Sequence, residues 1–145
     1  IIGTGEKFDV VLASEILEHV VNPSSFIRVC SDLLKVLLFF FETQFFLFFL
    51  LLLQPNGLCV ISTINRTLLS KIFAIEIAEN LLGWVSKGTH SHDKFISPEE
   101  LCEIMKNNNL NPLNIQGMTL NPIKNTWSFI PSTHVNYFMA GKKIE

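Results

Sequence analysis

Runs of apolar residues separated by polar turns divide the chain into short strands and amphipathic helices. Residues 8–13 (FDVVLA) and 57–63 (GLCVIST) are short, continuous apolar runs, a pattern typical of strands buried on both faces of a parallel sheet. Between them, Asn22-Pro23 marks a helix start, and apolar residues then recur at helical spacing as far as Lys35. The first part of the chain therefore predicts a strand–helix–strand unit.

The second half of the chain predicts two further helices and two late strands. An apolar-rich helix is expected over 67–85, and residues 97–100 (SPEE) form a capping box that begins another helix. Two strands follow, at about 112–119 and 134–141, with an Asn- and Pro-rich loop over 121–133 between them. Consecutive strands at the end of an alternating pattern predict an α/β sheet with an antiparallel strand at its C-terminal end.

One segment breaks this pattern. Residues 36–54 are almost entirely Val, Leu and Phe, and 7 of the 13 Phe in the chain lie there. A helix over 36–53 would just reach the length of a membrane span, but Glu42, Thr43 and Gln44 lie in its middle third, where a charge is costly. A soluble helix of this composition would need burial on all sides.

A third interpretation of the segment is a translated intron. A pyrimidine-rich tract encodes runs of Phe and Leu, Val36 and Gln54 have codons that match the ends of an intron, and the segment keeps the reading frame. Joining the chain across it gives LLK-PNG, an ordinary turn from a helix to a strand. We therefore interpret 36–54 as an apolar insert in one domain, a translated intron, with a membrane helix as the alternative.

Composition and charge exclude some classes of function. The chain has 145 residues, which suits one domain, and its 11 Lys+Arg against 13 Asp+Glu give a net charge of −2. That balance argues against a nucleic-acid partner, which normally meets a basic surface. Cys30, Cys59 and Cys102 lie too far apart in sequence to suggest a disulfide framework, so they are expected to be small core residues in a reducing compartment.

The residues with chemical potential follow the first predicted strand. Ligands of open α/β sheets bind beyond the carboxyl ends of the strands, and Ser14 stands at such an end. If residues 15–19 form a helical turn, then Glu15, Glu18 and His19 share one face. Two carboxylates and an imidazole there would hold a divalent cation such as Mg²⁺. The alternative is a solvated pair of glutamates with His19 packed beside them.

Several strings, taken in order, resemble the ubiquinone-biosynthesis O-methyltransferases: FDVVLASEILEHV, PNG followed by STINR, KGTH followed by KFISP, and VNY. The resemblance covers nearly everything outside 36–54. It implies the C-terminal part of a class I methyltransferase domain that uses S-adenosylmethionine and has a Rossmann-like sheet. The first three strands of that sheet, the glycine-rich loop, the acidic residue for the cofactor ribose and an upstream Arg have no counterpart in this chain. We therefore expect the chain alone to be inactive.

The resemblance also implies roles for individual residues. Ser14 matches a position that lines the S-adenosylmethionine pocket, and Glu15, Glu18 and His19 match the E-x-x-E-H site for Mg²⁺. The implied reaction is Mg²⁺-assisted O-methylation of a catechol hydroxyl on a polyprenylated ring. The implied setting is a ubiquinone-biosynthesis complex, associated peripherally with the matrix side of the mitochondrial inner membrane. Because the chain starts at Ile1 rather than at Met, its start carries no information about a targeting segment.

Other residues allow two interpretations each. His90 is the candidate for the catalytic base and His92 a second one, or both are loop histidines that bond to the local backbone. Trp84, in the predicted helix over 67–85, belongs either to a lid that admits the prenyl tail or leans on a membrane, or to an ordinary core helix. Trp127 and Phe129 would cover the substrate ring, or would merely pack.

Two other functions compete with this one. The chain could belong to a class I methyltransferase of another small molecule, although SEILEHV together with KGTH argues against it. It could also be a single-pass membrane or interaction protein that uses 36–53 as an anchor, in which case alkaline carbonate would not extract it from membranes.

Overall fold

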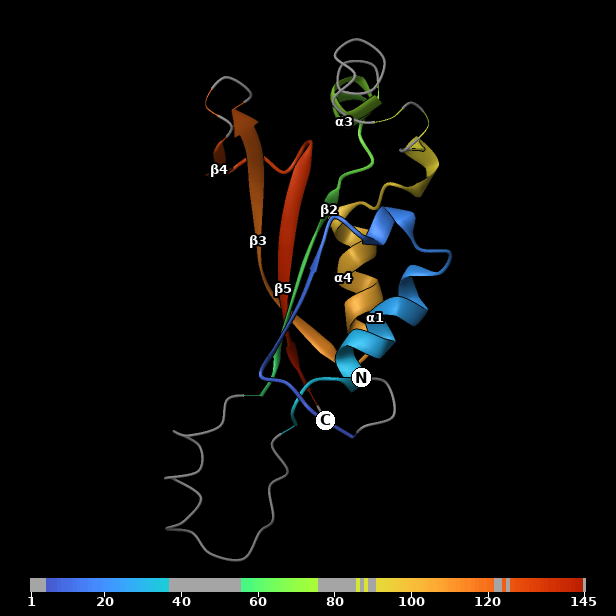
Figure 1. Cartoon of the computed structure of the whole chain (residues 1–145), viewed down its shortest axis with the longest axis vertical. Helices are drawn as coiled ribbons and strands as arrows, with labels where there is room; N and C mark the ends of the chain where they lie inside the picture. Colours follow the sequence, from blue (N-terminus) through green and yellow to red (C-terminus); the bar gives the residue numbers. More distant parts are fainter. Residues whose placement is uncertain are drawn as a thin grey trace, which may run out of the picture.

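The computed structural model describes residues 5–36, 56–75, 86, 88, 91–121, 124 and 126–144. They form a five-stranded sheet in the order β1-β2-β5-β3-β4, with helices α1 and α4 on one of its faces (Figure 1). The strands are β1 (Val10–Ser14), β2 (Leu58–Ile64), β3 (Leu110–Asn121), β4 (Thr126–Ile130) and β5 (Asn136–Lys143). The helical elements are η1 (Leu17–His19), α1 (Pro23–Asp32), α3 (Leu68–Ser70), η3 (His92–Lys94) and α4 (Pro98–Lys106).

The strand pairing confirms the predicted sheet. β1 and β2 are parallel, whereas β5 pairs antiparallel with β2 on one side and with β3 on the other. The prediction of a loop over 121–133 was wrong, because β4 lies within it and forms a hairpin with β3. Asn and Pro at the turn dominated the composition of this stretch. The five residues after the turn, TWSFI, include four that favour strands, namely Thr, Trp, Phe and Ile, and this signal was overlooked.

The helices begin where their capping residues predict. Asn22 accepts a hydrogen bond from the backbone N–H of Ser25 at 3.0 Å and starts α1. Ser97 and Glu100 form the predicted capping box of α4. The predicted helix over 67–85 begins as α3 and widens into a π-helical turn over 71–75, and its remainder, with Trp84, lies outside the described residues.

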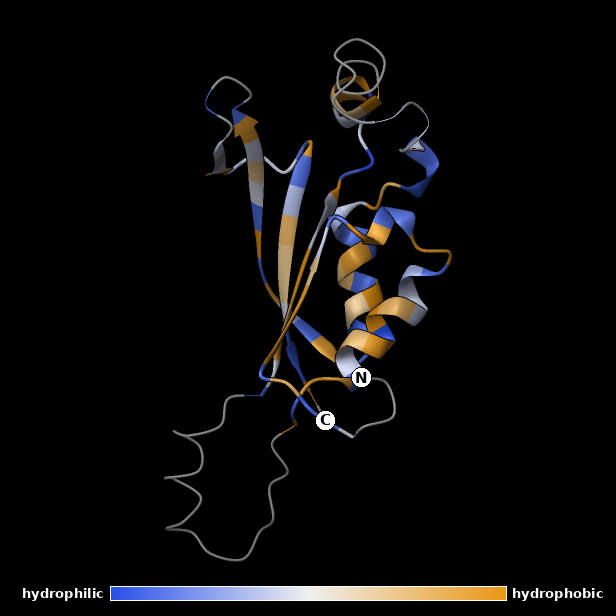
Figure 2. Cartoon of the chain, viewed as in Figure 1, coloured by the Kyte–Doolittle hydropathy of each residue, from blue (hydrophilic) through white to orange (hydrophobic). Residues whose placement is uncertain are grey.

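The core lies between the sheet and the two helices. Hydrophobic residues follow β1 and β2 and recur along α1 and α4 (Figure 2). Alternate strand residues face these helices and are buried, such as Ala13, Ile61 and Tyr137. The other face carries exposed apolar residues such as Leu12, which is 69% exposed, and no element of the described part of the chain covers it.

The cysteines are free thiols, as expected. Cys30 on α1 and Cys59 on β2 are buried in the core, and Cys102 is half-buried. The thiols of Cys30 and Cys59 interact directly. Their hydrogen bond lowers the pKa of Cys30 and, together with burial, raises the pKa of Cys59.

The two flanks of the apolar insert lie side by side. The backbone N–H of Gly57 donates to the carbonyl of Lys35 at 3.0 Å. Except for Val36, the segment 36–54 lies outside the described residues, so its interpretations stay predictions. Among the residues that are described, no helix is long and apolar enough to cross a membrane.

Candidate functional site

A sharp turn follows the carboxyl end of β1. Glu15 has a φ of 48°, in the left-handed region that few residues other than glycine adopt. Its backbone N–H donates to the carbonyl of Ser62 at 3.1 Å, which ties this turn to β2. The helical turn predicted over 15–19 was therefore wrong at its start. It spans only Leu17–His19, because the left-handed residue redirects the chain before it.

Glu18 places a carboxylate inside the protein. Its side chain is almost fully buried, and the hydroxyl of Thr63 donates to its Oε2 at 2.6 Å. The other oxygen, Oε1, accepts no hydrogen bond, and the Nε2 of His19 lies 3.8 Å from it. A buried carboxylate oxygen without a donor is costly unless a cation or a proton meets it. A bound cation between Glu18 and His19, or a protonated His19, would supply that partner.

The carboxylate of Glu15 is held differently. Ser62 donates to its Oε1 at 2.8 Å and the side-chain amide of Asn136 donates to its Oε2 at 3.1 Å. Successive residues of a strand point to opposite faces, so Ser62 and Thr63 hold Glu15 and Glu18 on different sides of β2. In the part of the chain that the structure describes, no three His, Cys, Asp or Glu side chains gather closely enough to hold a metal ion. In this arrangement Glu15 does not fit as a third ligand.

Ser14 belongs to the same group of side chains as Glu15. Its hydroxyl lies 3.2 Å from that of Ser62, its neighbour in the parallel pair of β1 and β2. Ser14 is exposed at the carboxyl end of its strand, as a cofactor-contacting residue must be. Its predicted role in the cofactor pocket stays a prediction.

The two histidine candidates for a base have different outcomes. His90 lies outside the described residues. The Nε2 of His92 lies 3.0 Å from the carbonyl of Thr67, and its ring packs edge-on against Phe95. Since a carbonyl only accepts, this nitrogen must be the donor. These contacts favour the interpretation of His92 as a histidine that fixes the local backbone.

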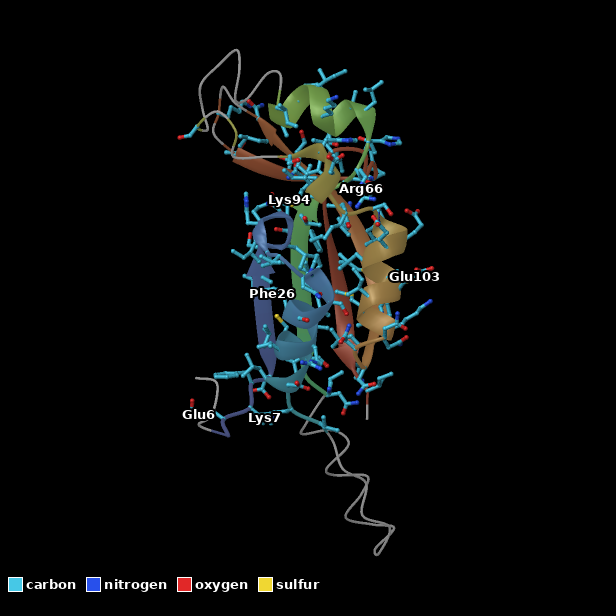
Figure 3. The ribbon with its side chains drawn as sticks, turned by 90° about the vertical axis from the view of Figure 1, so that its right-hand side faces the viewer. Glu6, Lys7, Phe26, Arg66, Lys94 and Glu103 are labelled. Atoms are coloured by element: carbon cyan, nitrogen blue, oxygen red, sulfur yellow. The ribbon has the colours of Figure 1, made fainter. Side chains whose placement is uncertain are left out.

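Arg66 ties the end of β2 to α4. Its Nε donates to the carbonyl of Phe95 at 2.7 Å, and one of its terminal nitrogens lies 3.0 Å from a carboxylate oxygen of Glu100. Figure 3 shows Arg66 near the start of α4, whereas Glu103 points outward from the same helix. The loop before α4 is thus held against the strand end that carries Ser62 and Thr63.

An apolar surface lies beside this region. It is formed by Leu68, which is 73% exposed, together with Leu69, Ile72 and Phe73 on α3 and the π-helical turn that follows it. Phe129 on β4 is also exposed and packs edge-on against Phe138. The side chain of Trp127 lies outside the described residues.

Sequence reasoning did not single out three residues that shape the site: Ser62, Thr63 and Asn136. All three lie in STINR and VNY, the strings that marked the family resemblance. Polar side chains at the carboxyl end of a buried strand are themselves a signal, because such side chains need partners there.

Comparison with known proteins agrees with this fold. A family model described as a methyltransferase domain matches residues 3–115. Three curated relatives named ubiquinone biosynthesis O-methyltransferase are similar to the chain. The protein from Rickettsia typhi is 38% identical over 94% of this chain and 48% of its own length. The protein from Azorhizobium caulinodans is 37% identical over 95% and 47%. The protein from Pelagibacter ubique is 40% identical over 91% and 47%, so the chain spans about half of each.

Two solved structures share the architecture. A methyltransferase from Thermotoga maritima that depends on S-adenosylmethionine, described as a possible histamine N-methyltransferase, has a TM-score of 0.59 at 12% identity. It matches 97% of this chain and 57% of that one. Magnesium protoporphyrin IX methyltransferase from Synechocystis, with bound S-adenosylhomocysteine, has a TM-score of 0.52 at 14% identity over 98% and 48%. At these identities the likeness shows the fold alone. The predicted class I methyltransferase fold is confirmed.

Proposed function

Because this chain belongs to the methyltransferase domain family, we propose that it is part of an enzyme that methylates a hydroxyl group in ubiquinone biosynthesis with S-adenosylmethionine. The observation that carries the proposal is the similarity of nearly the whole chain to proteins named ubiquinone biosynthesis O-methyltransferase. The fold neighbour that holds S-adenosylhomocysteine supports the choice of cofactor. Ser14, at the carboxyl end of β1, is the residue of this chain proposed to face that cofactor.

The proposed substrate is a catechol on a polyprenylated ring, and Mg²⁺ is the proposed metal. Glu18 and His19 are the ligands that the geometry favours, because the unbonded Oε1 of Glu18 lies next to the imidazole. Glu15, the third predicted ligand, would first have to release Ser62 and Asn136. When bound, Mg²⁺ lowers the pKa of a coordinated hydroxyl and orients it for transfer.

Three other residues hold the groups of the site in position. Thr63 fixes one oxygen of Glu18 and leaves the other toward His19. Arg66 and His92 hold the loops around the end of β2, so these groups keep their positions while substrate and product exchange. Of the two predicted candidates for the general base, His92 is bonded to the local backbone and His90 lies outside the described residues, so His90 stays the proposed base.

The same proposal accounts for the exposed apolar surface of α3. Leu68, Leu69, Ile72 and Phe73 are all exposed, and an exposed apolar group of this size suits a prenyl tail or the surface of a membrane. The prediction of a peripheral inner-membrane enzyme, on the matrix side of mitochondria and within a biosynthetic complex, belongs to this proposal.

The test is methyl transfer by the full-length protein to a short-chain polyprenyl catechol, followed by mass spectrometry with and without a chelator. We expect a singly methylated product that chelation suppresses and added Mg²⁺ restores. Glu18→Gln should lose this metal dependence together with most of the activity, whereas Glu99→Gln on the exposed side of α4 should not. Absence of product would refute the function, and product that is insensitive to chelation would refute the metal.

A further inference from the structure

Four polar side chains meet at the end of the sheet, and they are called the Glu15 cluster below: Ser14, Glu15, Ser62 and Asn136. They come from β1, the turn after it, β2 and the start of β5. The register pairs Ser14 with Ser62, and Asn136 with Ile64, which lies two residues after Ser62. Ser14, Ser62 and Asn136 therefore share the sheet face that α1 and α4 do not cover.

The hydroxyl of Ser62 has all its hydrogen-bonding capacity used within the cluster. A hydroxyl has one hydrogen to donate and two lone pairs to accept with. Ser62 donates to the Oε1 of Glu15 at 2.8 Å. It accepts from the backbone N–H of Glu15 at 3.1 Å. One lone pair is left, and the hydroxyl of Ser14 lies 3.2 Å away.

The direction of the remaining bond follows from the other two. Since the hydrogen of Ser62 goes to Glu15, the short contact between the two serines requires Ser14 to donate to Ser62. Ser14 then has only lone pairs to offer toward the exposed side. Asn136 supports the arrangement from β5, because its amide holds the second oxygen of the Glu15 carboxylate at 3.1 Å.

We propose that Asn136, Glu15 and Ser62 form a chain of positioning residues. Asn136 holds the Glu15 carboxylate, Glu15 accepts the hydrogen of Ser62, and Ser62 therefore makes the Ser14 hydroxyl an acceptor for an N–H or O–H group of the bound cofactor. The proposal rests on the proposed function in one respect, that Ser14 faces the cofactor. It assigns the Glu15 carboxylate to this cluster and not to the cation beside Glu18. The left-handed backbone of Glu15 fits this role, because strain at such a residue persists only where its surroundings hold it.

The cluster itself is tested by thermal unfolding of the chain. Asn136→Ala should lower the midpoint in the unaltered background and should have little further effect once Glu15→Ala has removed its partner. Asn114→Ala, at an exposed position of β3 on the same sheet, is the matched control. If Asn136→Ala costs no more than Asn114→Ala, or costs the same with and without Glu15, the clamp on Glu15 is wrong.

The positioning role is tested by calorimetric binding of S-adenosylhomocysteine to the full-length protein. Ser62→Ala should weaken binding by roughly five- to tenfold, the value of about one hydrogen bond, and Ser62→Thr should restore it. In a Ser14→Ala background, Ser62→Ala should have little further effect. Equal weakening in both backgrounds would mean that Ser62 does not act through Ser14, and would overturn the proposal.

The assignment of Glu15 is tested with Mn²⁺ as the probe, by paramagnetic resonance on the same protein. Glu18→Gln should weaken Mn²⁺ binding by about tenfold or more, whereas Glu15→Gln should leave it within about twofold. Equal weakening by both would overturn the assignment. If the unaltered protein binds no Mn²⁺, the metal in the proposed function is refuted, while the unfolding and cofactor-binding results still decide the role of the cluster.

Discussion

The two carboxylate oxygens of the buried Glu18 lie in different environments. Its carboxylate has one oxygen bonded to Thr63 and one oxygen without a donor, 3.8 Å from the imidazole of His19. The sequence pattern E-x-x-E-H predicted the residue types at this site. It did not predict the separation of Glu15 from Glu18, because the left-handed backbone of Glu15 depends on contacts with β2 and β5 that lie far away in the sequence.

Thr63→Val should destabilise the chain by roughly 2–3 kcal/mol, because it removes the donor to a buried carboxylate while keeping the shape of the side chain. Denaturant unfolding at neutral pH measures the loss. Thr63→Ser keeps the hydroxyl and should lose distinctly less. A Thr63→Val protein as stable as the unaltered chain would show that Glu18 has another partner.

The lowered pKa of Lys143 predicts that the stability of the fold depends on pH in the alkaline range. Its ammonium donates to the hydroxyl of Ser31 at 2.8 Å, and burial lowers its pKa, with Asp32 opposing and Lys7 adding to the shift. Between this lowered pKa and the usual value of 10.5, the unfolded chain binds more protons than the folded one, so stability should rise with pH.

Lys143→Met should therefore flatten the rise of the unfolding midpoint between neutral pH and about pH 10. Lys142→Met, at the exposed neighbouring position of β5, is the control and should keep the rise. The same slope in both variants would locate the effect elsewhere in the chain.

At the scale of elements, two glycines lie on the helix-covered face of the sheet. They should tolerate substitution by alanine to different degrees. A Cβ on Gly117 of β3 would lie 1.8 Å from the backbone oxygen of Ser132, which cannot move aside without moving its loop. A Cβ on Gly141 of β5 would meet the Met105 sulfur at 3.1 Å, and that flexible side chain can shift.

Gly117→Ala should therefore cost about 3 kcal/mol, the upper part of the range for overpacking, and Gly141→Ala about 1 kcal/mol or less. Chemical unfolding of both variants gives the comparison. If Gly117→Ala is tolerated as well as Gly141→Ala, the loop at Ser132 has room to adjust.

Elements whose start is fixed by hydrogen bonds within one turn could be predicted from the sequence. A strand that depends on pairing with a distant segment could not. Asn22-Pro23 and Ser97-Pro98 fix helix starts through bonds within one turn, and both were predicted correctly. The strand β4 was missed because its stability comes from pairing with β3, whereas its own sequence lies in a stretch rich in turn residues. The start of α3 at Thr67 was predicted and has a local capping box with Ser70, to which the bond from Thr67 to the carbonyl of His134 adds a distant anchor.

At the scale of the whole molecule, the apolar segment 36–54 interrupts a turn whose two ends already meet. The N–H of Gly57 donates to the carbonyl of Lys35 at 3.0 Å, and the Asn56 amide donates to the carbonyl of Lys143. Deleting 36–54 would join Lys35 to Pro55 and leave the sequence Lys-Pro-Asn-Gly. That sequence suits a type I turn, which favours Pro second and Gly fourth and closes by this same first-to-fourth hydrogen bond.

Deletion of 36–54 should therefore leave the sheet intact and raise both the soluble fraction and the unfolding midpoint. Closing a tight turn instead of a loop of about 20 residues saves roughly 2 kcal/mol of chain entropy. Removing 15 Val, Leu and Phe side chains also removes apolar surface that would favour association. Replacing 36–54 by a Gly/Ser linker of equal length separates these effects, because it should improve solubility without the gain in midpoint. A fall in the midpoint on deletion, with the linker variant falling equally, would show that the segment packs against the domain and would refute the interpretation as a translated intron.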